Sequence, residues 1–425
     1  MEAREAASEV QALALDAADP LSALRDEFLI PSHGNGEQAY FCGNSLGLQP
    51  RAVRAAIERE LDRWATRAVE GHFEGPHPWL RVQDELTPAL AALVGAEPAE
   101  VVVMNTLTVN LHLMMASFYR PTPERHAILI EQGAFPSDRH AVLGQLALHG
   151  YDPQGALIEV APNGDGFFST AAFAEVLAAQ GQRIALVLLP GVQYLSGQVL
   201  DLRALSELAH RHGCCVGFDL AHAVGNVPLA LHDSHCDFAV WCSYKYLNGG
   251  PGALAGCFVH ARHAHTPRPR LAGWWGHEAA TRFRMAPEFV PEAGAQGWQV
   301  SNPPILALAP LRASLEPFVR VGIAQLRERS LRLTGYLETL IRTRLERMLE
   351  IRTPADPAQR GCQLSLRVRG GRSAGRALFE HLAAHGVIGD WREPDVIRLA
   401  PVPLYNRHSD CLRAVLAIEA WATRQ

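Results

Sequence analysis

Between residue 82 and residue 259, short apolar runs alternate with segments of helical length. Helices fit between the runs, for example over residues 170–179 and 202–211. Each run is apolar almost throughout, which is typical of strands that are covered on both faces. The alternation predicts an α/β fold with a mostly parallel, seven-stranded sheet and helices on both faces. The expected strands are residues 101–104, 127–131, 156–160, 184–189, 215–219, 238–242 and 254–259.

The character of the sequence changes after residue 310, and this change indicates a second, smaller domain. We predict a large domain over residues 71–310 and a small α+β domain over residues 311–425. Residues 1–70 are expected to form an N-terminal segment that packs with the small domain. The elements expected in the small domain are a helical region over residues 311–349, a strand within residues 362–369, and helices near residues 374–385 and 410–423.

The composition argues against several classes of partner. The chain has a formal net charge of -5 and a pI near 6.4, so it lacks the basic surface that nucleic acid or anionic lipid requires. Residues 1–20 carry five acidic side chains and no long apolar stretch, which fits neither a secretory signal nor a transit peptide. The most apolar longer stretch, residues 101–119, is interrupted by polar residues and does not suit a membrane span. We expect a cytoplasmic protein.

The spacing of cysteine and histidine predicts no metal site. The eight cysteines form no CxxC pair, and most lie in apolar runs, as reduced core residues do. The nineteen histidines are scattered and form no HExxH motif.

Lys245 is the only lysine in the chain, since Lys and Arg together number 39 and the other 38 are arginines. Arginine therefore supplies positive charge wherever either residue would serve. Lysine differs from arginine in having an amine that can lose its proton and form an imine with a carbonyl compound. An apolar run, residues 238–241, precedes Lys245, and a glycine-rich loop, residues 249–252, follows it. This setting favours a Schiff-base lysine over a solvated surface lysine.

Two further motifs lie at predicted strand ends. Asp219 ends an apolar strand, and His222 follows three residues later. A buried acid needs a cationic or donor partner, which a protonated pyridine nitrogen would supply; a helix-capping Asp is the alternative. Residues 105–112 follow a strand and open a helix, where backbone amides and the hydroxyls of Thr106 and Thr108 would bind a phosphate. An ordinary N-cap is the alternative there.

A phosphate-binding loop, an acid and a lysine, each after a different strand of a doubly wound sheet, form the arrangement that pyridoxal 5'-phosphate (PLP) requires. Phe135 follows another strand and could stack on a flat ring. Gly43 and Gly47 permit tight backbone conformations and close approach of a ligand, but a plain turn explains them equally well. The combination predicts a PLP site built around Lys245.

The same residues lie in segments that resemble the kynureninase family, whose members have the fold of type I PLP enzymes. The resemblance extends from residues 43–48 to residues 399–406, which is nearly the whole chain. Family members use water to cleave kynurenine or 3-hydroxykynurenine into L-alanine and anthranilate or 3-hydroxyanthranilate. The resemblance implies this activity, in tryptophan catabolism and NAD precursor synthesis, carried out by a homodimer. The segments that carry it are residues 107–112, 135–138, 243–248 and 301–304.

The resemblance also implies roles for individual residues. Lys245 would bind PLP covalently and remove the α-proton, and Asp219 would pair with the pyridine nitrogen. Tyr244, also at the cofactor, would transfer a proton near the β-carbon, and Arg398 would bind the substrate carboxylate with its bidentate guanidinium. The other expected cofactor-binding residues are Leu107, Thr108, Phe135, Pro136, Ser137, Asp138, His222, Trp274 and Asn302. The residues expected to face the aromatic end of the substrate are Ser45, His72, Ser301 and Asn302.

The preference between the two substrates stays open. His72 and Asn302 are polar groups that could hydrogen-bond a ring hydroxyl, as in relatives that favour 3-hydroxykynurenine. A site built to bind a hydroxyl rejects the analogue without it, because its own polar groups are then left unpaired.

Three other functions are compatible with this fold. A cysteine desulfurase would need an exposed, activated cysteine, and no cysteine here has that setting. An aminotransferase would release a keto acid and leave the cofactor aminated. A non-catalytic binding protein could dispense with the lysine, so the presence of Lys245 in a chain with no other lysine argues against it.

Overall fold

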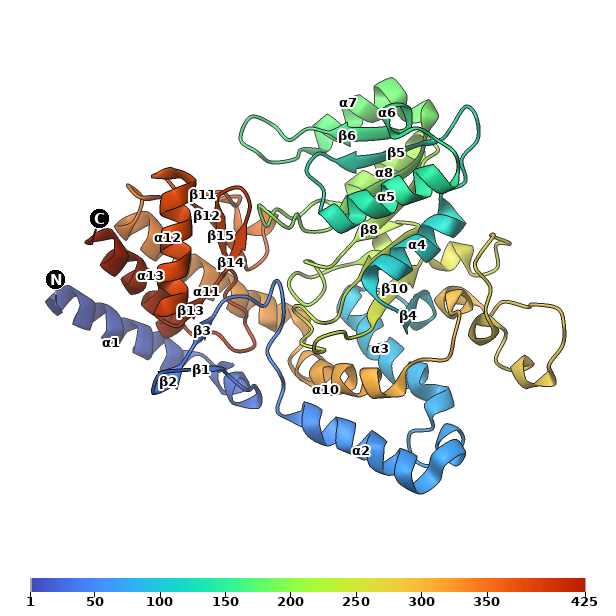
Figure 1. The fold of residues 1–425 in the computed structure, drawn as a ribbon, viewed down its shortest axis with the longest axis horizontal. Coiled ribbons are helices and arrows are strands. Elements are labelled where there is room, and N and C mark those ends of the chain that lie inside the picture. Colours follow the sequence, from blue (N-terminus) through green and yellow to red (C-terminus); the bar gives the residue numbers. More distant parts are fainter. Residues whose placement is uncertain (1, 425) are drawn as a thin grey trace.

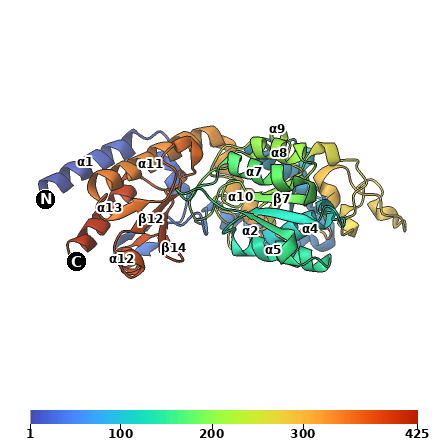
Figure 2. The ribbon, with the colours of Figure 1, turned by 90° about the horizontal axis from the view of Figure 1, so that it is seen from above.

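The computed structural model describes residues 2–424 as two lobes of unequal size. Figure 1 shows the larger lobe, formed by the middle of the chain, beside a smaller lobe that contains the first and last helices. These two helices, α1 (Glu2–Ala18) and α13 (His408–Ala422), lie side by side in both views (Figures 1 and 2).

A seven-stranded sheet forms the centre of the larger lobe, which confirms the predicted α/β fold. The strands are β4 (Val101–Met104), β5 (Ala127–Glu131), β6 (Leu157–Val160), β7 (Ile184–Pro190), β8 (Cys215–Asp219), β9 (Phe238–Trp241) and β10 (Ala255–Val259). Their order is β4-β10-β9-β8-β7-β5-β6, and neighbours are parallel except for the two pairs that involve β10. Strand β6 begins one residue later than predicted because Ala156 ends a short helix, α6 (Pro153–Ala156).

Helices cover both faces of this sheet. They are α3 (Val82–Val94), α4 (Leu107–Phe118), α5 (Pro136–Leu148), α7 (Thr170–Gln180), α8 (Leu202–Arg211), α9 (Leu231–Ser234) and α10 (Ile305–Val321), while α2 (Ala52–Arg67) lies outside them on α10. Successive strand residues point to opposite faces. In β4, Val101 and Val103 join a core with α3, α7, α8 and α10, whereas Val102 and Met104 join a core with α4 and α5. Burial on both faces explains why the strands are apolar throughout.

The smaller lobe is built on an antiparallel sheet in the order β11-β12-β15-β14. Its strands are β11 (Leu349–Ile351), β12 (Leu364–Val368), β14 (Asp390–Arg392) and β15 (Val396–Leu399), and its helices are α11 (Ile323–Arg344), α12 (Gly371–Ala384) and α13. The helical region expected over residues 311–349 is divided between α10 and α11. The division falls at Gly322, whose φ of 83° only glycine adopts without strain.

The N-terminal segment contacts both lobes. The Asp16 carboxylate accepts hydrogen bonds from the backbone N–H groups of His408 and Ser409, which joins α1 to the smaller lobe. Helix α2 instead packs on α10 through an apolar contact that includes Ala56 and Ala313. The division into residues 1–70, 71–310 and 311–425 stays a prediction. The remaining strands are the hairpin β1 (Ser32–His33) and β2 (Gly36–Glu37), and the parallel pair β3 (Ala39–Tyr40) and β13 (Val387–Ile388).

Two further features bear on partners. No helix within residues 2–424 is long and apolar enough to cross a bilayer. Ligand atoms of Glu100, His232 and His260 lie within 4.8 Å of one another, as metal ligands do. Glu100, however, already accepts hydrogen bonds from His232 Nδ1 at 2.9 Å and the Ala261 amide at 2.7 Å, and His260 Nδ1 accepts one from the Arg262 amide. The Glu100 carboxylate and His260 Nδ1 are therefore already engaged within the fold.

Candidate active site

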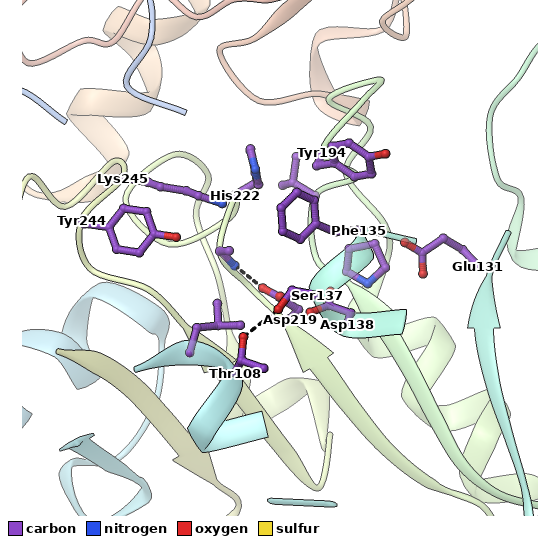
Figure 3. Close-up of a pocket in the computed structure, with 14 residues that line it drawn as sticks. Thr108, Glu131, Phe135, Ser137, Asp138, Tyr194, Asp219, His222, Tyr244 and Lys245 are labelled. Atoms are coloured by element: carbon purple, nitrogen blue, oxygen red, sulfur yellow. Dashed lines mark hydrogen bonds between the residues drawn. The ribbon is translucent and has the colours of Figure 1, made fainter. Parts of the chain in front are cut away.

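A pocket lies at the carboxyl ends of the sheet strands, where a ligand is expected in a doubly wound fold. Figure 3 shows side chains that converge on it from the loops after β5, β7, β8 and β9 and from the start of α4. The lining residues are Leu107, Thr108, Glu131, Phe135, Ser137, Asp138, Pro190, Val192, Tyr194, Asp219, Ala221, His222, Tyr244 and Lys245. Nine of these residues were predicted from the sequence, and the structure brings them into one pocket.

Lys245 lies on the loop after β9 and directs its amine into the pocket (Figure 3). Its Nζ is 5.8 Å from the centre of the Phe135 ring and 6.0 Å from that of Tyr244. The Gly47 amide donates to the Tyr244 carbonyl at 2.8 Å and holds this loop in place. A Cβ at position 47 would lie 2.3 Å from the Lys245 carbonyl oxygen. The glycine at position 47 is therefore needed for the close packing of this stretch against the lysine loop.

Two buried carboxyl groups, Asp219 and Asp138, lie together on the floor of the pocket (Figure 3). The Ala221 amide donates to Asp219 Oδ1 at 2.7 Å. Burial raises the pKa of Asp219, and Lys245 opposes this shift only in part. Burial and the neighbouring Asp219 raise the pKa of Asp138 well above its usual range. Two carboxyl groups in contact cannot both ionise cheaply, so Asp138 is the protonated partner and Asp219 the acceptor.

The starts of α4 and α5 meet at the same pocket. The hydroxyls of Thr108 and Ser137 are 2.8 Å apart and join the two helices. The Thr106 side chain makes no capping hydrogen bond, so the first amides of α4 are not occupied by an ordinary N-cap. Uncapped amides at the start of α4, with the two hydroxyls beside them, are suited to an anion such as a phosphate.

Aromatic and imidazole rings line the upper part of the pocket. The Phe135 ring meets the Tyr194 ring edge to face, with centroids 5.2 Å apart. Burial, followed by the positive charge of Lys245, lowers the pKa of His222 well below its usual range, so this imidazole is neutral. Glu131 and Tyr194 were not predicted, although Glu131 ends β5 as Asp219 ends β8, and Tyr194 lies on the loop four residues after β7. Burial raises the pKa of Glu131 to about 8.

Arg398 and Ser45 lie together beside this pocket. Arg398 Nη2 donates to Ser45 Oγ at 3.3 Å, and its Nη1 donates to the carbonyl of Tyr194 at 2.6 Å. The sequence did not indicate their common partner, Asp390, which accepts from Arg398 Nε at 2.7 Å. Pro136, the first residue of α5, separates the pocket residues Phe135 and Ser137 but does not itself line the pocket.

Four predicted residues lie elsewhere in the chain. His72 packs edge to face on Trp79, and Trp274 packs in the same way on Phe283, with centroids 5.1 and 5.5 Å apart. Trp274 is 48% exposed. Ser301 and Asn302 lie on the exposed segment before α10. Within one chain, none of the four lines the Lys245 pocket.

Comparison with known proteins agrees with this geometry. A family model described as the Kynureninase C-terminal domain matches residues 326–418. A kynureninase from Xanthomonas euvesicatoria pv. vesicatoria (strain 85-10) is 65% identical over 416 residues, which are 98% of each chain. The chain belongs to the kynureninase family. A second kynureninase, from Xanthomonas axonopodis pv. citri (strain 306), is 64% identical over 98% of each chain. The protein is thus a PLP-dependent hydrolase that acts on carbon–carbon bonds.

Solved structures with the same fold are PLP enzymes of other activities. Cysteine desulfurase CsdA from Escherichia coli superposes with a TM-score of 0.77 at 17% identity, over 96% of this chain and 99% of that one. A C-DES mutant with glycine covalently linked to its PLP cofactor gives 0.75 at 17% identity, over 93% and 99%. At this identity the likeness shows the kynureninase fold to be that of type I PLP enzymes.

The thiols of the chain do not suit desulfurase chemistry. Cys42 and Cys215 are the only two described cysteines that are partly exposed. Burial raises the pKa of each of these two thiols to about 11. A reactive cysteine needs the opposite shift, toward the thiolate.

The polar groups of the pocket fit PLP. Asp138 Oδ1 is buried and has no hydrogen-bond partner among the described residues. A pyridinium N–H placed against the acid pair would supply both a donor and a positive charge. Thr108 and Ser137 would hold the phosphate, and Lys245 would hold the cofactor through its amine. The residues suited to the phosphate, the acid pair and the Lys245 amine thus all line one pocket.

Proposed function

We propose that this enzyme hydrolyses L-kynurenine, 3-hydroxy-L-kynurenine or both, and releases L-alanine and the corresponding aromatic acid. The observation that carries the proposal is the Lys245 amine directed into the same pocket as the Asp138–Asp219 pair. The identity of 65% to a kynureninase over 98% of the chain supports the same reaction. No other function has comparable support, because the similarity to cysteine desulfurases is a similarity of fold alone.

The chain would hold the cofactor by groups of different chemistry. Thr108, Ser137 and the amides of α4 and α5 would bind the phosphate. Asp219, backed by Asp138, would keep the pyridine nitrogen protonated, and Phe135 would lie against the ring. Bound PLP withdraws electrons from the substrate α-carbon and makes its proton removable.

Proton transfer would then be divided between two neighbours in the sequence. Lys245, released from the cofactor by the incoming amino group, would take the proton from the α-carbon. Burial raises the pKa of the Tyr244 phenol, so this hydroxyl stays protonated at neutral pH and can donate. It would deliver its proton to the β-carbon as the bond to the γ-carbon breaks. The oxygen of water ends in the carboxylate of the aromatic product.

We further propose that the enzyme is a cytoplasmic homodimer. Three large apolar side chains form an exposed cluster: Phe73, Trp274 and Phe283 are 55%, 48% and 51% exposed. An exposed apolar cluster of this kind is typical of a surface that contacts another protein chain. A hollow of about 660 Å³ beside the lysine loop, lined mainly by apolar residues of α2, α10 and residues 29–50, is a further surface for a second chain. The eight cysteines are all free, as expected in a reducing compartment.

In such a dimer, His72, Trp274, Ser301 and Asn302 of one chain would complete the pocket of the other. Mixing two inactive variants tests this arrangement. Lys245→Ala and Trp274→Ala would each be inactive alone, but a mixed dimer keeps one intact site. Refolding an equal mixture is expected to restore roughly a quarter of the wild-type activity. No recovery in a mixture that light scattering shows to be dimeric would contradict the crossing of Trp274.

Turnover of the two substrates tests the activity itself. PLP-loaded enzyme should release equal amounts of L-alanine and aromatic acid from at least one of them. The ratio of the kcat/KM values for the two substrates tests whether His72 and Asn302 hydrogen-bond the ring hydroxyl, because a site that binds a hydroxyl discriminates strongly against the analogue without it. Cofactor binding without alanine release from either compound would overturn the proposed reaction and leave the fold standing.

A further inference from the structure

A short turn between β4 and α4 leads the chain from the edge of the sheet into the pocket. Strand β4 ends at Met104, and α4 begins at Leu107. Leu107 and Thr108 both line the pocket, and the Thr108 hydroxyl lies 2.8 Å from that of Ser137 (Figure 3). The course of this turn therefore decides where the Thr108 hydroxyl and the first amides of α4 lie.

The backbone of this turn has a conformation that needs support. Asn105 has a φ of 48°, in the left-handed region that asparagine enters more readily than most residues. Its carbonyl accepts a hydrogen bond from the Ala255 amide of β10 at 2.9 Å. The Asn110 amide donates to the Thr106 carbonyl at 3.0 Å and begins the hydrogen bonding of α4, so the amides of residues 107–109 have no partner within that helix.

One buried side chain holds the turn from the side of the helix. Asn110 is 0% exposed. Its Oδ1 accepts from Asn105 Nδ2 at 3.0 Å, and its own Nδ2 donates to the Met104 carbonyl at 2.9 Å. A side-chain amide can accept and donate at the same time. Asn110 uses both functions on the two residues that precede Thr106, and it thereby fixes the direction in which the chain enters α4.

Asn110 can act on a ligand only through this turn, because it does not itself line the pocket. A buried amide is costly unless its hydrogen bonds are made. An apolar residue at position 110 would remove the donor that the Met104 carbonyl receives and would release the Asn105 side chain. The turn would then have to be ordered when the ligand binds, and that cost weakens binding.

We propose that Asn110 is a positioning residue for the phosphate of PLP. It fixes the turn between β4 and α4, so that the Thr108 hydroxyl and the free amides of α4 are already in place when the phosphate arrives. The inference rests on the phosphate site proposed above for Thr108 and Ser137, and it adds to that site a support that does not touch the cofactor. The preference of the protein for the phosphorylated cofactor then depends on Asn110.

The test compares PLP with pyridoxal, which keeps the ring and the aldehyde but lacks the phosphate. Each compound is titrated into cofactor-free protein, and binding is followed by the absorbance of the compound. The wild type should bind PLP more tightly. In Asn110→Ala this preference is expected to fall roughly 5- to 30-fold, the size of one to two net hydrogen bonds, while the Kd for pyridoxal stays unchanged.

Two further variants make the result specific. Ser117→Ala is the matched control, because Ser117 is also 0% exposed on α4 and accepts from Trp298 Nε1 at 2.9 Å, but lies near the other end of the helix. It should leave the preference for PLP unchanged. Asn105→Gly removes one of the two hydrogen bonds to Asn110, and glycine suits the left-handed backbone. Its preference is expected to fall by roughly 2- to 5-fold.

The result can contradict the inference in two ways. If Asn110→Ala weakens PLP and pyridoxal equally, Asn110 supports only the general fold and the proposal is overturned. A wild-type preference in both Asn110→Ala and Asn105→Gly overturns it as well. If Asn110→Ala does not fold, Asn105→Gly decides alone: a lowered preference supports the proposal, and a wild-type preference overturns it.

The failure of this inference is distinct from the failure of the proposed function. Thr108→Ala tests the phosphate site itself, because Thr108 is the residue proposed to touch the phosphate. A wild-type preference for PLP in Thr108→Ala would refute that site. A lowered preference in Thr108→Ala with a wild-type preference in Asn110→Ala would refute only the role of Asn110. Neither titration needs turnover, so the cleavage of kynurenine is tested separately.

Discussion

Asp219→Asn removes one charge from the floor of the pocket and little else. Asparagine has nearly the same shape, and its carbonyl can still accept the Ala221 amide that Asp219 accepts at 2.7 Å. What is lost is the charge-assisted bond that we propose between Asp219 and the pyridine nitrogen, in a buried position. Such a bond contributes about 1.5–3 kcal/mol, and each ~1.4 kcal/mol is tenfold in rate. We therefore expect kcat to fall about 10- to 100-fold at saturating PLP, with the fold intact.

Asp138→Asn is the matched control. Burial and Asp219 raise the pKa of Asp138 well above its usual range, so the native side chain is already a neutral donor. An amide preserves that donor, and the loss in kcat is expected to be less than a tenth of the loss in Asp219→Asn. Steady-state kinetics and the absorbance of bound cofactor give both values. Equal losses, or an Asp219→Asn rate within about threefold of the wild type, would refute the assignment of charge within the pair.

Two further changes test how the pocket is built. Gly47→Ala would place a Cβ 2.3 Å from the Lys245 carbonyl oxygen, so we expect a loss of about 1–3 kcal/mol in stability and a large drop in kcat. Gly335→Ala is the control, because open space surrounds that position and the change should be harmless. Denaturant titration measures the stability of each variant, and activity assays measure its kcat. The unfolded state loses the Glu131 proton near pH 4.5, whereas the buried carboxyl keeps it to about pH 8, so wild-type stability falls across that window. Glu131→Gln should therefore stabilise the cofactor-free protein increasingly between pH 4.5 and 8. Equal pH profiles of the melting temperature in the two proteins would contradict this.

The position of the cofactor site followed from the sequence because parallel strands end at one edge of the sheet. Asp219 and Lys245 each follow an apolar run, so a parallel sheet brings them together whatever the details of packing. Tyr194 and Glu131 obey the same rule, but neither carries a distinctive chemical signal in the sequence. Their environment, rather than their identity, makes them part of the site.

The pair of Asp390 and Arg398 could not be predicted in the same way. Asp390 and Arg398 are partners because β14 and β15 pair in one particular register, and a shift by one residue would turn them to opposite faces. His72 and Trp274 illustrate a different limit. They came from family resemblance, and one chain holds them away from the Lys245 pocket. A single chain therefore cannot test the roles expected of His72 and Trp274, and the mixed-dimer experiment is designed to do so.

The most direct test of the account is to locate the covalent bond to the cofactor. Reduction of the PLP-loaded enzyme with borohydride fixes an imine as a stable amine, and peptide mass spectrometry then maps the pyridoxyl group. The account predicts one label per chain, on Lys245, the single lysine of the sequence. A chain that binds PLP but carries no label at Lys245, or carries it on another amine, would contradict the site as described.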